Sequence, residues 1–149
     1  MNDPMDIRKY TELFFRDITS LGGMFIYGIL CIVLLSIGEL KLALQLIMAF
    51  ILITVVAVFV RSIYFRPRPK EEKYSNFLEK IDASSFPSIH AARVWAMTIL
   101  LCNATNQIAF IFLGATAVLV CYSRLALKKH HMSDVIVGSL IGIAIAWLV

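Results

Sequence analysis

Charged residues are scarce in this chain: they make up 16% of its 149 residues, whereas hydrophobic residues make up 60%. A typical soluble domain carries about 25% charged and about 45–50% apolar residues. The excess apolar residues lie in long runs, which excludes an ordinary soluble domain and predicts an integral, multi-pass protein, with the cell membrane as its expected location. The length suits one domain, so we expect a single membrane domain over residues 1–149.

Cysteine is also rare. Cys31, Cys102 and Cys121 all lie inside apolar runs, and their spacing matches no metal site. Because an odd number of cysteines cannot all pair within one chain, we expect free buried thiols rather than a disulfide framework.

Five apolar runs predict an all-α, polytopic bundle of about five transmembrane helices. The runs cover residues 22–37, 42–65, 90–102, 108–122 and 135–149. The second run is long enough to cross about 30 Å of hydrocarbon at about 1.5 Å per residue. The last run is short for a span, so its helix is expected to begin within the preceding polar turn.

Residues 1–20 precede the first run and are typical of an amphipathic helix. An apolar stripe recurs at helical spacing, and charged residues line the other face. The stripe comprises Ile7, Tyr10, Phe14, Ile18 and Leu21, and the charged face Arg8, Glu12 and Arg16. This pattern fits a helix in the membrane interface, and it fits equally a helix that packs on the spans as a cap.

Alternating crossings place the polar segments on two sides of the membrane. The 66–87 loop is the longest polar segment and must lie outside the hydrocarbon. Counting crossings puts residues 1–20, the 66–87 loop and the 123–134 turn on one face, and Lys41 with residues 103–107 on the other. We therefore expect a functional site where the first three segments meet.

Ionisable residues at the ends of apolar runs gather on that face. They are Arg61, Arg68, His90, Arg124, His130 and Asp134. Singly, an arginine at the end of a span is usually an interface anchor, and an i,i+4 His–Asp pair is a weak signal. An unpaired guanidinium in hydrocarbon is costly, however, and guanidinium forks match the oxygens of phosphate. Three arginines that meet two histidines therefore indicate phosphate chemistry on a lipid.

Two of the histidines are placed for catalysis. His130 and Asp134 are four residues apart, so on a helix they share one face, and a carboxylate bound to one ring nitrogen leaves the other as a nucleophilic lone pair. His131 is three residues from Asp134, so spacing alone leaves it as an alternative. His90 follows Ser88 at an expected helix start, where free N–H groups bind anions and His90 can protonate a leaving oxygen.

The spacing of these residues resembles three motifs of the type 2 phosphatidic-acid phosphatase superfamily, a group of membrane lipid phosphatases related to acid phosphatases and vanadium haloperoxidases. The motifs read Arg61, six residues, Arg68-Pro69; then Pro87-Ser88-Ile89-His90; then Ser123-Arg124, five residues, His130, three residues, Asp134. Several specified residues in three ordered blocks make a chance match much rarer than for one short motif. The resemblance covers residues 61–134.

The resemblance implies a role for each motif residue. His130 would be the nucleophile that becomes a phosphohistidine, and Asp134 would orient it, which selects His130 over His131. His90 would be the general acid for the leaving group. The phosphate would be held by Arg61, Arg68, Ser88, Ile89 and Arg124. The resemblance implies no metal and no other cofactor, and the absence of any carboxylate or cysteine cluster of metal-ligand type agrees.

The implied substrate is a membrane lipid phosphate or diphosphate, such as polyprenyl diphosphate, phosphatidic acid or phosphatidylglycerophosphate, which the sequence does not separate. The expected partners are this lipid and the bilayer, and no nucleic acid. The alternative is a catalytically silent, phosphate-binding membrane scaffold or carrier subunit, supported by Ile89 in place of the usual glycine. A small transporter or channel would need polar residues at mid-span, where this chain is almost wholly apolar.

Two further features concern the topology. The family commonly has six spans, so the amphipathic helix of residues 1–20 would stand where the first span lies. All lysines and arginines except Lys41 lie on or near the face of the site, which favours a cytoplasmic active site by the positive-inside rule. Family members more often resemble outward-facing enzymes, so the orientation stays open.

Overall fold

The computed structural model describes residues 4–70, 72–103 and 107–149, and within these ranges it contains α-helices and no strands. The helices are α1 (Pro4–Ser20), α2 (Met24–Ser36), α3 (Leu40–Ile63), α4 (Phe77–Ala83), α5 (Ile89–Asn103), α6 (Gln107–Ala126) and α7 (Met132–Leu148). The prediction of an all-α protein is confirmed.

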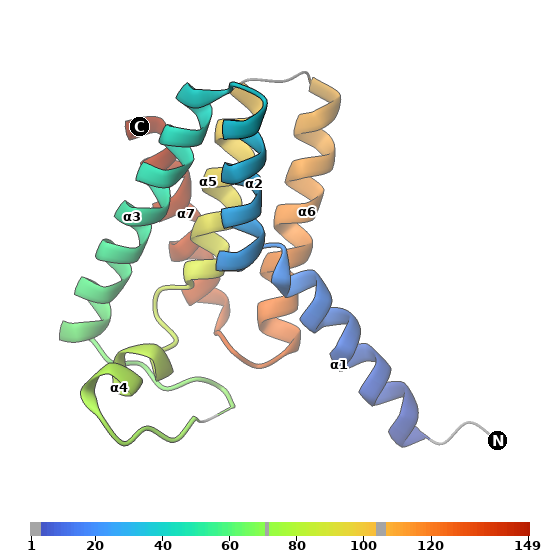
Figure 1. The fold of residues 1–149 in the computed structure, drawn as a ribbon. Coiled ribbons are helices and arrows are strands. Elements are labelled where there is room, and N and C mark those ends of the chain that lie inside the picture. The colour runs from blue at the N-terminus through green and yellow to red at the C-terminus, as the bar shows by residue number, and fades with distance from the viewer. Residues whose placement is uncertain (1–3, 71, 104–106) are drawn as a thin grey trace.

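Five of these helices form the bundle. α2, α3, α5, α6 and α7 run side by side, and each corresponds to one of the predicted apolar runs (Figure 1). α7 begins at Met132, inside the preceding polar turn, as the short final run predicted. By length and composition, three segments of the described chain can cross a membrane, namely Ile7–Ser36, Leu40–Ile63 and Ile108–Ala126. The count of five crossings therefore stays a prediction.

The outer surface of the bundle is apolar. Large side chains such as Phe25, Phe112 and Trp147 are 70–80% exposed. A contiguous surface of this kind would be an aggregation liability in water, but hydrocarbon accommodates it at no cost. The helices therefore present their apolar side chains to lipid.

α5 and α7 pack against each other at the centre of the bundle. Small residues allow their backbones to lie very close together. A Cβ atom added to Gly138 would overlap the carbonyl oxygen of Ser88, and one added to Gly142 would overlap that of Ala92. The two glycines are four residues apart, so they lie on one face of α7. Small residues at this spacing let two helix backbones approach closely, which is how helices associate in membranes.

Arg93 is a charged residue inside the predicted run 90–102. It is buried, donates to Thr54 Oγ1 at 3.3 Å, and its guanidinium lies 4.2 Å from the centre of the Phe50 ring. A cation over an aromatic face is stabilised by the ring quadrupole, and more so when water is excluded. This stacking explains how α5 tolerates a guanidinium in the bundle.

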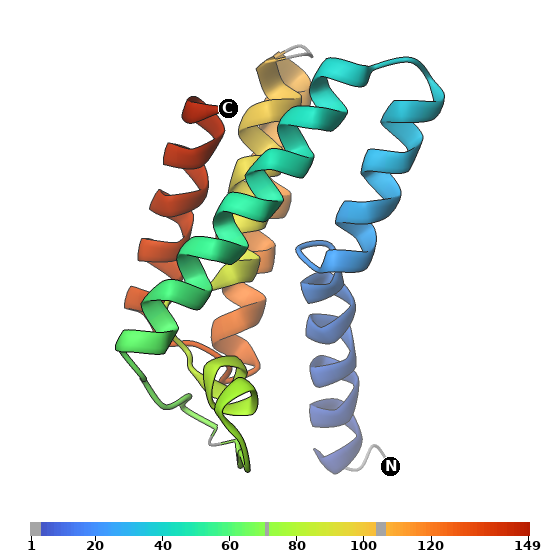
Figure 2. The same cartoon turned by 60° about the vertical axis from the view of Figure 1, so that its left-hand side comes forward.

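The predicted N-terminal helix is α1, which continues α2 beyond the end of the bundle (Figure 2). Its last turns pack on α6: the Phe15 and Tyr122 rings meet edge to face at 5.6 Å, and the hydroxyls of Thr19 and Ser123 are 2.6 Å apart. Earlier apolar residues of α1, such as Tyr10, are exposed. The packed end fits the cap interpretation, and the interfacial placement of the rest stays a prediction.

The predicted 66–87 loop contains one short helix, α4. Asn76 precedes α4 and its side chain accepts a hydrogen bond from the Glu79 N–H at 2.8 Å, which satisfies a free donor of the first turn. The loop, α4 and the α6–α7 loop (residues 127–131) all lie at the same end of the bundle, together with the end of α3 and the starts of α5 and α7 (Figure 1).

Candidate active site

The His130 imidazole lies at this end of the bundle and is only 3% exposed. Its Nδ1 is 2.6 Å from the backbone carbonyl oxygen of Ser85. A carbonyl oxygen can only accept, so Nδ1 carries the proton and donates, and Nε2 keeps the lone pair. Nε2 lies 3.4 Å from Nη2 of Arg124, which donates toward it. The structure thus directs one ring nitrogen of His130, with its lone pair, toward a guanidinium.

The environment of His130 disfavours its protonation. Burial, and then the nearby charge of Arg124, lower the pKa of His130 well below its ordinary value of 6.5. The imidazole is therefore neutral at neutral pH, which is the form a nucleophile needs.

This lowered pKa predicts a loss of stability in acid. Between the folded and the unfolded pKa of His130, only the unfolded chain binds the proton, so the free energy of unfolding falls as the pH drops below 6.5. The slope is up to about 1.4 kcal/mol per pH unit for one proton. Thermal unfolding in detergent at several pH values should show a larger acid loss for the wild type than for His130→Gln. Equal losses in both proteins would contradict this account.

Asp134 lies close to His130 but does not bind its ring. Asp134 Oδ2 is 4.0 Å from His130 Nδ1, beyond hydrogen-bonding distance. Oδ2 accepts instead from the His131 N–H at 2.8 Å, and Oδ1 accepts from Arg66 Nη1 at 2.6 Å. The expectation of a shared helical face is wrong because α7 begins at Met132, so His130 precedes the helix. The carboxylate caps the start of α7, and the Ser85 carbonyl orients the imidazole.

His131, the alternative nucleophile, has a different environment. Its Nε2 lies 3.2 Å from the backbone carbonyl oxygen of Pro67, to which it donates. The ring is thus directed at the 66–87 loop, while its backbone N–H is bound by Asp134. The first contact ties His131 to the 66–87 loop and the second belongs to the start of α7, and they leave His130 as the histidine beside Arg124.

The three predicted arginines are brought to the same end of the bundle. Arg61 donates from Nη2 to the Pro87 carbonyl oxygen at 2.9 Å, and Arg68 donates from Nη2 to the Asp82 carbonyl oxygen at 2.6 Å. Within the described residues, the buried Nε atoms of Arg61, Arg68 and Arg124 have no hydrogen-bond partner, and the same holds for Arg93, which stacks on Phe50 inside the bundle. A buried unpaired donor is costly and needs an explanation. Donors of this kind are suited to the oxygens of a phosphate.

The start of α5 carries the second motif. Ser88 is fully buried, its N–H donates to the Asp134 carbonyl oxygen at 3.0 Å, and its hydroxyl accepts from the Ala91 N–H at 3.5 Å. The motif therefore lies directly against the start of α7. In the described part of the chain, the His90 imidazole makes no hydrogen bond, so it remains available to a leaving group.

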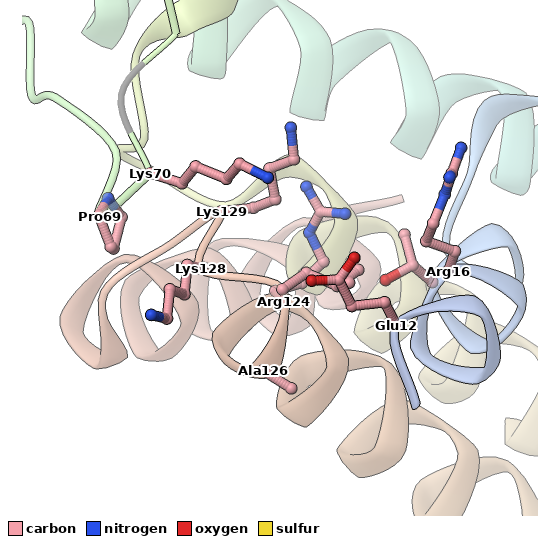
Figure 3. Close-up of a pocket in the computed structure, with 10 residues that line it drawn as sticks. Glu12, Arg16, Pro69, Lys70, Arg124, Ala126, Lys128 and Lys129 are labelled. Carbon is pink, nitrogen blue, oxygen red and sulfur yellow. The ribbon is translucent and has the colours of Figure 1, made fainter. Parts of the chain in front are cut away.

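A cavity of about 770 Å³ opens beside the site, between α1 and the α6–α7 loop. Among its described lining residues are five basic side chains and one acid, namely Arg16, Lys70, Arg124, Lys128, Lys129 and Glu12. Figure 3 shows Lys70, Lys129 and Arg124 extending toward a common space, with Glu12 and Arg16 of α1 across from them. Arg124 both lines this cavity and contacts His130 Nε2. A single side chain, that of Arg124, thus separates the cavity from His130.

Comparison with known proteins identifies the family. The sequence matches the PAP2 superfamily over residues 40–149, which is most of the chain. The chain belongs to the PAP2 superfamily. The resemblance carried by the three motifs is confirmed.

Two solved structures share the PAP2 fold seen here. The crystal structure of Aquifex aeolicus LpxE is 26% identical, with a TM-score of 0.79, and the match covers 99% of this chain and 86% of that chain. The crystal structure of the first transmembrane PAP2 type phosphatidylglycerolphosphate phosphatase from Bacillus subtilis is 19% identical, with a TM-score of 0.76, and covers 99% and 76%. The chain is an integral, multi-pass membrane protein of this family.

Ile89 departs from the usual glycine of the second PAP2 motif. It is the first residue of α5 and has ordinary helical backbone, so no glycine-only conformation is required there. Its side chain packs against the buried core between the helices. The isoleucine therefore fits the helix start without displacing Ser88 or His90.

Four residues that contact the candidate site residues were not among those predicted from the sequence. They are Arg66, Ser85, Glu72 and Lys129. Arg66 pairs with Asp134, Ser85 binds His130, and Glu72 binds both Arg68 and Lys129. The position of Lys129 could have indicated it, because this residue directly precedes His130 in the sequence. No sequence pattern could have indicated Ser85, because it acts through its backbone carbonyl, which every residue type possesses.

Proposed function

We propose that this PAP2 protein is a metal-independent phosphatase that removes a phosphate from a membrane lipid phosphate or diphosphate through a phosphohistidine intermediate. The observation that carries the proposal is the buried, neutral His130, whose Nδ1–H is fixed by Ser85 and whose Nε2 faces Arg124. A directed lone pair beside a fixed cation is what nucleophilic attack on an anionic phosphate requires.

The first step forms the phosphoenzyme. The Nε2 lone pair of His130 attacks phosphorus, and an N–P bond forms as the P–O bond to the lipid breaks. The leaving oxygen keeps the electron pair of that bond and takes a proton from His90, whose imidazolium form the negative charge of the bound phosphate stabilises. The Ser85 carbonyl remains bound to Nδ1–H and stabilises the positive charge that develops on the ring.

The second step returns the enzyme to its starting state. Water attacks phosphorus, His90 accepts a proton from this water, and the N–P bond breaks with its electron pair returning to Nε2. The products are inorganic phosphate and free His130. His90 thus donates a proton in the first step and accepts one in the second.

The arginines stabilise the negative charge of the transferred group. Arg61, Arg68 and Arg124 supply fixed guanidinium charges, and Ser88 with the Ile89 amide supplies donors at the start of α5. In phosphoryl transfer, most of the catalysis comes from such positioning and charge stabilisation. These groups supply the positive charge that a metal ion supplies in other phosphatases. Asp134 acts as a positioning residue, because it caps α7 directly behind the nucleophile.

The membrane location supports a lipid substrate. The site lies at the end of a bundle with an apolar outer surface, so a lipid can keep its tail in hydrocarbon while its phosphate reaches the site. One similar structure is described as a phosphatidylglycerolphosphate phosphatase. Polyprenyl diphosphate, phosphatidic acid and phosphatidylglycerophosphate are the candidate substrates.

A phosphate-release panel tests this function. Purified protein in detergent is incubated with polyprenyl diphosphate, polyprenyl phosphate, phosphatidic acid and phosphatidylglycerophosphate, with and without a metal chelator. We expect release from at least one lipid at a rate that the chelator leaves unchanged, because guanidinium groups supply the charge. Release that stops on chelation would overturn metal independence, and no release from any lipid would favour the silent scaffold.

A further inference from the structure

We propose that Arg68 and Lys129 form an anion subsite for a phosphoryl group, and that the Glu72 carboxylate occupies this subsite until a phosphoryl group displaces it. This inference rests on the proposed function, because it concerns how the same site receives its substrate and releases its product. Lys129 thereby becomes a phosphate-binding residue, and Glu72 an internal competitor.

The Glu72 carboxylate is held between two cations. Its Oε2 accepts from Arg68 Nη1 and its Oε1 accepts from Lys129 Nζ. Each oxygen of the carboxylate therefore accepts its own charge-assisted hydrogen bond. Arginine and lysine bind the oxygens of phosphate in the same way. The carboxylate therefore marks a position where these two side chains converge on an anion.

This anion position belongs to the active site. Lys129 directly precedes His130, and Glu72 lies close enough to Arg124 for their charges to interact. Arg124 and Lys129 both line the large basic cavity. An anion bound by Arg68 and Lys129 consequently lies within the reach of the charge of Arg124, the guanidinium that contacts His130 Nε2. The subsite can take either the phosphate under attack or a second phosphate on the same lipid.

Glu72 is charged and able to leave. Burial raises the pKa of its carboxyl, but hydrogen bonds from Lys129 and Arg68 outweigh burial and lower it, so the side chain is ionised at neutral pH. The side chain is 29% exposed, and a hollow of about 220 Å³ lies beside it. A phosphoryl dianion carries twice the charge of the carboxylate, so it competes for the two cations.

A purely structural ion pair would behave differently. If Glu72 only held the loop in place, its removal would disorder Arg68 and Lys129 and weaken phosphate binding. If Glu72 competes with phosphate, its removal strengthens phosphate binding. The two interpretations predict effects of opposite sign.

The test measures the inhibition constant of inorganic phosphate on lipid-phosphate hydrolysis. Glu72→Gln is expected to lower this constant roughly threefold to tenfold, because two partly exposed ion pairs no longer oppose binding. Glu79→Gln is the matched control: it removes one charge from the same loop but lies at the exposed start of α4, so it should leave the constant unchanged. A constant that is unchanged or raised in Glu72→Gln overturns the proposal.

A second pair of variants tests Lys129. Lys129→Ala should raise the inhibition constant several-fold, whereas Lys73→Ala, an exposed lysine of the same loop, should not. Comparing a lipid monophosphate with a lipid diphosphate distinguishes the two sources of the phosphoryl group. If Lys129→Ala raises KM for both lipids, the subsite takes the phosphate under attack; if it raises KM for the diphosphate alone, it takes the second phosphate. No change in either KM or the inhibition constant excludes Lys129 from phosphate binding.

A binding measurement separates this inference from the proposed function. Calorimetric titration of the purified protein with inorganic phosphate requires no turnover. Tighter binding to Glu72→Gln than to wild type supports the subsite even if no lipid is hydrolysed. Equal or weaker binding to a folded Glu72→Gln variant overturns the subsite even if the wild type is an active phosphatase. Glu72→Asp, whose shorter side chain cannot span both cations, should move binding in the same direction and serves if Glu72→Gln does not fold.

Discussion

His130→Ala is expected to abolish phosphate release, with a fall in kcat of roughly 10⁴-fold or more, since removal of a nucleophile leaves only binding and charge stabilisation. The buried imidazole provides the lone pair at Nε2, which faces Arg124. The measurement is phosphate release by the purified variant under substrate saturation.

The matched control is His131→Ala, which removes an imidazole from the adjacent position. His131 donates to the Pro67 carbonyl oxygen, so its loss should loosen the loop and change kcat by less than about tenfold, the scale of one lost hydrogen bond. If His131→Ala loses all activity and His130→Ala retains it, the assignment of the nucleophile is reversed. Full activity in both variants would remove histidine from the mechanism.

Gly142→Ala is expected to destabilise the protein by about 1–3 kcal/mol or more, because the added methyl group meets backbone rather than a movable side chain. Its Cβ would overlap the Ala92 carbonyl oxygen, so α5 and α7 must separate to admit it. Thermal unfolding in detergent checks this effect.

Gly28→Ala and Gly114→Ala are the controls for this substitution. Both glycines lie within helices, and a Cβ at either position meets no atom within 4 Å. Alanine has the higher helix propensity, so these variants should be as stable as the wild type or slightly more stable. A Gly142→Ala variant as stable as they are would show that the α5–α7 contact tolerates expansion.

Span counting predicted that the candidate site residues gather on one face, because it depends only on where apolar runs begin and end. Arg61 lies in the last turn of α3, Ser88 precedes α5 and Arg124 lies near the end of α6, and all three lie at the same end of the bundle. The exact start of α7 was harder to predict, since the polar turn before it offers several helical starts. That one uncertainty changed the partner of His130 from Asp134 to Ser85.

Contacts between distant segments could not be predicted from the sequence, for a different reason. In the sequence, Glu72 is one of several charged residues in a polar loop. No pattern in the neighbouring residues indicates that its side chain contacts both Arg68 and Lys129. The spacing of Gly138 and Gly142 marks a small face on α7 but does not name the helix that packs on it. Such pairings follow from how the helices approach one another, which a single sequence does not encode in any local pattern.

The bond from the Ser88 N–H to the Asp134 carbonyl oxygen joins the starts of α5 and α7 into one rigid block, and Gly138 lies against the same Ser88. Ser88 is therefore fixed to the bundle core, whereas the basic cavity is lined in part by α1, a helix that projects beyond the core. The part of the cavity wall that α1 forms is thus separate from the residues that contact His130. Substitutions at Glu12 and Arg16 can therefore change the charge of the cavity while leaving the contacts of His130 in place.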